Sequence, residues 1–98
     1  MSVEIYNPKR YECHVTIAEP VDSAHVVSVV ARFSQEAGFE FDGGVIITGA
    51  AVTDESYNGL LLRARGLKAK LYDILGVKVS GIKVEEILFD EKYGVMVR

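Results

Sequence analysis

The chain has 98 residues, of which 49% are hydrophobic and 26% charged, and its formal net charge at pH 7 is −3. These proportions are typical of a single globular domain spanning residues 1–98, and they exclude a disordered chain. The apolar runs are far shorter than the roughly 20 residues of a membrane-spanning helix, and the acidic balance disfavours non-specific binding to nucleic acid.

The first elements follow from the spacing of apolar residues. Apolar and polar side chains alternate over residues 11–17, which predicts a strand. Asp22 or Ser23 then caps a helix that runs to about Ala37, in which apolar side chains recur at helical spacing. Gly38 is a typical residue just beyond a helix C-terminus.

A hairpin is predicted next. Phe39 and Phe41 alternate with acidic residues, and residues 42–44 (Asp-Gly-Gly) provide a tight turn into the apolar run 45–48. The small residues 49–51 are unusual inside a strand. They indicate a bulge or a close approach of another group to the backbone.

The segment 60–75 admits two interpretations. Apolar residues at 60, 62 and 64 fit the inner face of a strand, after which Gly66 begins a helix that ends near Gly76. Alternatively, one long helix contains Gly66 in its interior, at a cost of about 1 kcal/mol relative to Ala. We favour the strand followed by the shorter helix, because Gly59 and Gly66 lie where that arrangement needs its boundaries.

The C-terminal region predicts further β structure. A strand over 82–89 contains a bulge at residues 85–86, where the alternation fails, and a hairpin loop returns the chain through Val95, Met96 and Val97. The whole order predicts an α+β fold. It is a ferredoxin-like split β-α-β-β-α-β sandwich, with two helices packed on a mainly antiparallel sheet and an extra C-terminal β-hairpin.

Residues suited to catalysis or metal binding are few and poorly spaced. Cys13 and His14 point to opposite faces of a strand, and His25 lies on the following helix, so no zinc site is expected. Ser23 and His25 face apart on that helix, which leaves no nucleophile beside a base. Acidic pairs lie in predicted loops or at the bulge, where solvated surface is expected: 54–55, 85–86 and 90–91. We therefore predict no metal, no cofactor, no catalytic residue and no enzymatic activity.

The composition also bears on cellular location. Cys13 is the only cysteine, so an intrachain disulfide framework is excluded, and the first residues contain neither a basic segment nor a long apolar one. These features predict a cytoplasmic protein. Scarce side-chain amides together with abundant Val, Glu, Lys and Arg are typical of thermophilic proteins.

The cations are concentrated in one part of the chain. Residues 57–84 contain six cations and one acid, whereas the remainder contains five cations and thirteen acids. If Gly66 begins a helix, its free N–H groups and the neighbouring cations form a site for a phosphate-type anion. The candidate residues are Arg63, Arg65, Gly66, Lys68 and Lys70. Otherwise these charges are neutralised by the acidic remainder of the molecule or of a second subunit, or stand in water.

Two functional hypotheses follow. The favoured one is a non-enzymatic domain that acts through self-association or protein–protein interaction, because Val95, Met96 and Val97 form an apolar edge strand that a second copy would cover in a homodimer. The alternative is an anion-binding module for a phosphorylated small molecule or a nucleic acid, centred on residues 63–70. Nucleic acid is the less expected ligand, since the strand aromatics lack basic neighbours of the RNA-binding type. No membrane partner is expected.

Overall fold

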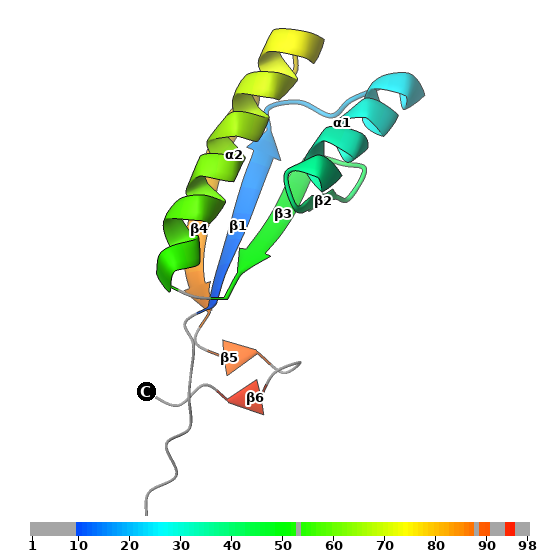
Figure 1. Cartoon of the computed structure of the whole chain (residues 1–98). Helices are drawn as coiled ribbons and strands as arrows, with labels where there is room; N and C mark the ends of the chain where they lie inside the picture. The colour runs from blue at the N-terminus through cyan, green and yellow to red at the C-terminus, as the bar shows by residue number, and fades with distance from the viewer. Residues whose placement is uncertain (1–9, 53, 88, 91–93, 96–98) are drawn as a thin grey trace, which may run out of the picture.

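A computed structural model describes residues 10–52, 54–87, 89–90 and 94–95. Figure 1 shows two helices on one face of a four-stranded antiparallel sheet. The strands are β1 (Arg10–Ile17), β2 (Phe39–Phe41), β3 (Ile46–Ala51) and β4 (Val79–Ile87), in the spatial order β2-β3-β1-β4. The helices are α1 (Ala24–Glu36) and α2 (Asp54–Leu75). The predicted α+β fold with β-α-β-β-α-β order is thereby confirmed.

The C-terminal hairpin consists of two short strands outside the main sheet. β5 (Phe89–Asp90) and β6 (Gly94–Val95) pair with each other in a separate two-stranded sheet (Figure 1). Val95 therefore does not extend the four-stranded sheet, and Met96 and Val97 lie outside the described residues. The long outer edge of the main sheet is provided by β4.

The core lies between the sheet and the two helices. Burial alternates strictly along β1, so that the apolar side chains of Tyr11 to Ile17 face the helices and the polar ones face away. Val30 and Phe33 of α1 pack against this face. From α2 the buried side chains are Leu60, Ala64, Leu67 and Leu71. Their spacing of three and four residues is that of one helical stripe.

Residues 54–75 form one continuous helix, so the strand predicted before Gly66 is wrong. Leu60 and Ala64 are fully buried, whereas Leu62, which the strand interpretation placed on the same inner face, is 65% exposed. The helical period therefore decides the conformation. Gly66 lies on the exposed side of α2 with no neighbouring atom near the position of a Cβ, so its presence costs helix propensity without breaking the helix.

The β1–β4 pairing corrects a second prediction. The register runs without a break from Arg10 opposite Ile87 to Thr16 opposite Gly81, and the irregularity lies between Thr16 and Ile17. The predicted bulge at residues 85–86 is therefore wrong. The register places Lys83 opposite His14 and Glu85 opposite Glu12, so both side chains lie on the sheet face away from the helices.

Candidate functional site

The five predicted anion ligands do not meet at a helix start, because Gly66 is inside α2. On a helix of 3.6 residues per turn, Arg63 and Lys70 lie on one flank, and Arg65 and Lys68 lie about half a turn away. The first pair contacts α1, which places the second pair on the flank turned away from α1. The free N–H groups on which an anion site depended are absent here, since an interior helical N–H is bonded within the helix. Anion binding at these residues stays a prediction, but a helix N-terminus at Gly66 no longer supports it.

Arg63 joins α2 to the end of α1. Its Nη1 donates a hydrogen bond of 2.8 Å to the backbone carbonyl of Ala37, the C-cap of α1. Its guanidinium carbon lies 5.5 Å from the centre of the Phe39 ring. A cation at this position compensates the negative end of the α1 dipole and satisfies a terminal carbonyl.

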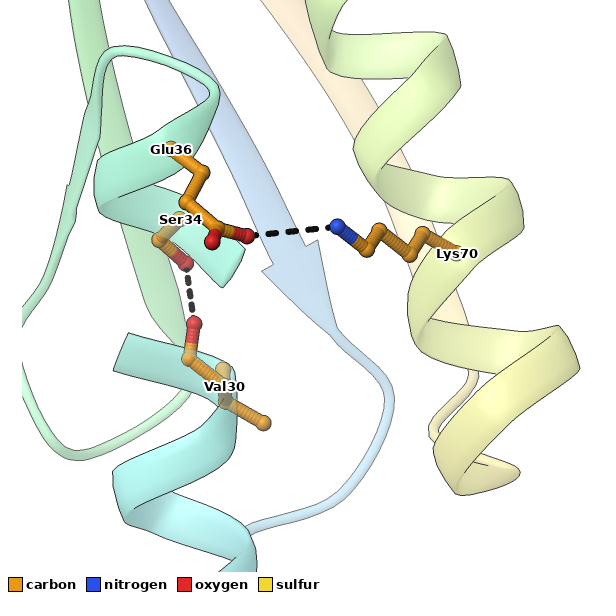
Figure 2. Close-up of polar contacts among 4 residues, drawn as sticks. All are labelled: Val30, Ser34, Glu36 and Lys70. Carbon is orange, nitrogen blue, oxygen red and sulfur yellow. Dashed lines mark hydrogen bonds and ion pairs between the residues drawn. The ribbon is translucent and has the colours of Figure 1, made fainter. Parts of the chain in front are cut away.

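Lys70 makes a second link on the same flank. Figure 2 shows its side chain reaching from α2 toward Glu36 of α1, with Nζ 3.2 Å from Oε1. The same Nζ lies 4.3 Å from the centre of the Phe33 ring. Nearby in Figure 2, the buried Ser34 hydroxyl donates a 2.7 Å hydrogen bond to the Val30 carbonyl, so its polar group is satisfied within α1. Arg63 and Lys70 therefore act as helix-to-helix contacts.

The expected ligands for metals are dispersed. Cys13 is fully buried on the core face, His14 lies on the opposite face of β1, and His25 is exposed on α1. Burial raises the pKa of the Cys13 thiol, an effect that the nearby Arg63 charge partly offsets. Within the described residues no group of three His, Cys, Asp or Glu side chains could hold a metal ion. No helix of the described chain is long and apolar enough to cross a membrane.

One pocket of about 330 Å³ lies where β1 leads toward α1 and where α2 leads into β4. The residues that line it are Ile17, Ala18, Glu19, Pro20, Val21, Gly76, Val77 and Lys78. Glu19 and Lys78 are the charged members, and Ala18 N–H is already bonded to the Lys78 carbonyl at 2.8 Å. The lining contains no nucleophile with an adjacent base.

The sheet face away from the helices is unusually rich in charge. Lys83 Nζ lies 2.6 Å from Glu85 Oε1 on β4, and His14 Nε2 lies 2.8 Å from Glu12 Oε1 on β1. Across the ladder, Glu12 is opposite Glu85 and His14 is opposite Lys83. β4 thus contains a pair of unlike charge and β1 contains a contact between histidine and glutamate, whereas the cross-strand neighbours Glu12 and Glu85 have the same charge.

The charged side chains on this face of β1 and β4 were not predicted, although the sequence contains a signal for those of β4. Lys83 and Glu85 are two positions apart, which places them on one face of a strand. The assumed bulge at residues 85–86 obscured that relation. The position of β4 at the outside of the sheet depends on strand order, which local sequence patterns do not specify.

Comparison with known proteins gives little further guidance. No protein-family model and no curated protein matches the sequence. Among solved structures, the chain is similar to an acylphosphatase from Coxiella burnetii, with a TM-score of 0.44, 16% sequence identity and coverage of 92% of this chain and 94% of that one. The neighbour is named as an enzyme, and the prediction of no enzymatic activity is withdrawn. A likeness at this level assigns no activity to the present protein.

Proposed function

We propose that this chain is an association domain, and that a strand from another polypeptide pairs with the outer edge of β4. The observation that supports the proposal is the nine-residue length of β4, which among the described strands pairs with β1 alone. Such an edge presents a row of backbone donors and acceptors to its surroundings. Addition of a strand satisfies those groups and extends the sheet.

The opposite edge is a weaker candidate. β2 has three residues, and glycines with positive φ flank it at Gly38 (81°) and Gly43 (87°). An added strand would gain few ladder bonds there before the backbone turned away. The edge of β4 offers a partner about three times that length of extended backbone.

Hydrogen exchange tests this proposal directly. In a strand at the edge of a sheet, alternate N–H groups point to the neighbour and to solvent. We expect the solvent-facing N–H groups of 79–87 to exchange rapidly at low micromolar protein and to become protected near millimolar protein. Backbone N–H groups of β1 and β3 serve as internal controls, because both strands are paired on both sides in the single chain.

A variant separates β4 from the C-terminal hairpin. Val95→Lys alters β6, which among the described strands pairs with β5 alone, and it is expected to leave the concentration-dependent protection of β4 unchanged. Loss of association in this variant would instead support the sequence-based prediction of an interface at residues 95–97. A monomeric mass by light scattering at all concentrations, with exchange of β4 independent of concentration, would refute the proposal.

A further inference from the structure

We infer that the partner strand is β4 of a second copy, and that the two-fold axis of the resulting dimer passes midway between the two Val84 residues. This inference rests on the proposed association at β4 and adds the identity and register of the partner. A two-fold axis perpendicular to a sheet makes equivalent edge strands antiparallel and keeps each side chain on its own face. Only registers in which one residue lies directly opposite the same residue of the other copy satisfy that condition.

The charges of β4 distinguish among these registers. An axis at Lys83 places the two Lys83 side chains opposite each other, and an axis at Glu85 does the same with two acids. An axis at Val84 places Lys83 of each copy opposite Glu85 of the other. Direct cross-strand pairs of unlike charge stabilise a sheet and like pairs destabilise it. Residues 81–87 of one copy would then face residues 87–81 of the other, which uses most of β4.

The neighbouring strand β1 strengthens the choice of Val84. Within one chain Glu12 is opposite Glu85 in the ladder, so two acidic residues are cross-strand neighbours on the exposed face. In the proposed dimer the row continues from Glu12 through Glu85 to the partner's Lys83. A cation from the second copy therefore lies next to Glu85, at the end of a row that already contains two acids. The two-fold axis generates this arrangement twice, once for the Glu85 of each copy.

Charge on an edge strand also prevents unwanted pairing, and this bears on specificity. A strand with one sign of charge repels a second copy in most registers. Lys83 and Glu85 instead carry opposite signs at adjacent positions of one face, joined by a 2.6 Å contact within the chain. The pattern is therefore complementary to itself in the register centred on Val84 and unfavourable in the registers centred on Lys83 or Glu85.

Charge reversal tests the register. Lys83→Glu places two acids opposite each other at both symmetry-related positions, and Glu85→Lys places two cations there. We expect each single variant to dimerise roughly tenfold or more weakly than the unmodified chain at low salt, as measured by sedimentation velocity. An equimolar mixture of the two variants should form heterodimers, because each then supplies the charge that the other requires. The double variant Lys83→Glu/Glu85→Lys should regain the homodimer.

The control is Glu40→Lys, a reversal on β2 at the opposite edge of the sheet, which should leave dimerisation unchanged; circular dichroism establishes that every variant is folded. If the single variants dimerise as well as the unmodified chain, and the mixture shows no preference, the register at Val84 is refuted. Persistent concentration-dependent protection of β4 would then still support edge pairing. A monomeric chain without that protection would remove both the register and the proposed function.

Discussion

Gly49 lies on β3 directly opposite Phe39 of β2, on the face that packs against the helices. A Cβ at this position would lie 2.7, 2.8 and 3.0 Å from three carbons of the Phe39 ring. The close approach expected from the small residues 49–51 is therefore confirmed, and the approaching group is an aromatic ring. Glycine is needed here for space, since its backbone is ordinary strand.

Gly49→Ala and Gly66→Ala are expected to change stability in opposite directions. The first forces Phe39 to move within the core and should lower the free energy of unfolding by about 1–3 kcal/mol. The second meets no atom within 4 Å on the exposed side of α2 and should raise that free energy by about 0.5–1 kcal/mol. Urea denaturation measures both. A destabilising Gly66→Ala would contradict the continuous helix described here.

At the scale of the elements, Arg63 and Lys70 of α2 hold the end of α1. They contact a backbone carbonyl, two aromatic rings and one carboxylate there. Gly38 follows this end with φ of 81°, and a Cβ there would overlap the Arg63 guanidinium. One glycine thus provides both the left-handed turn that ends α1 and the room for the cation that caps it.

Arg63→Ala should lower the free energy of unfolding by about 1 kcal/mol, because the Ala37 carbonyl loses its donor and Phe39 loses its cation. Lys70→Ala removes an exposed ion pair and should cost no more than about 1 kcal/mol. The matched control is Arg65→Ala. Arg65 is exposed and has no hydrogen bond or ion pair with the part of the chain that the structure describes, so its change should stay within about 0.5 kcal/mol. Equal effects at 63 and 65 would contradict the capping role.

Thermal unfolding with inorganic phosphate extends this comparison. If residues 63–70 bound an anion, phosphate would raise the melting temperature and both arginine variants would abolish the rise. An unchanged melting temperature in phosphate would contradict anion binding at these residues.

Local patterns sufficed for the elements whose period is unambiguous. The alternation of 11–17 predicted β1, and the apolar spacing after a cap at Asp22 or Ser23 predicted α1. The structure selects Ser23, whose hydroxyl accepts a hydrogen bond from Val26 N–H. The pattern failed over 60–75, where Leu60 and Ala64 fit both the period of a strand and that of a helix. Packing of the Leu60 and Ala64 side chains in the core then determines the helix, and a tertiary contact of this kind outweighs the propensity of one glycine.

The candidate site was less accessible from sequence than the fold. The cation cluster attracted attention by its density, yet a helix distributes four such residues over both flanks. The edge of β4 depends on the order of strands in space. That order follows from how the two helices cross over the sheet, which no short stretch of sequence specifies.

At the scale of the molecule, the proposed dimer should respond to salt and pH through the exposed face of β4. The Lys83 contact lowers the pKa of Glu85 below its ordinary value of 4.5, and the Glu85 contact raises the pKa of Lys83 above 10.5. Glu12 faces Glu85 and His14 faces Lys83 from β1. Glu85 therefore keeps its charge until the pH falls below 4.5, and Lys83 keeps its charge until the pH exceeds 10.5.

Association should accordingly weaken as the pH falls through the lowered pKa of Glu85, and it should weaken steadily with added salt, because exposed charges are screened within about 10 Å at 0.1 M. Sedimentation at a series of salt concentrations and at pH 3.5 and 6 measures both effects. Glu85→Gln should remove most of the acid response. Salt-independent dimerisation would contradict a register chosen by charge.

The unequal lengths of the two sheet edges limit how large an assembly can grow. Two copies joined at β4 use both long edges, and each end of the combined sheet is then a three-residue β2 flanked by glycines in left-handed conformation. A third copy would find almost no extended backbone with which to pair. A chain that joins through one edge in this way forms a closed pair with a fixed stoichiometry, where a chain with two long edges could polymerise into a fibre.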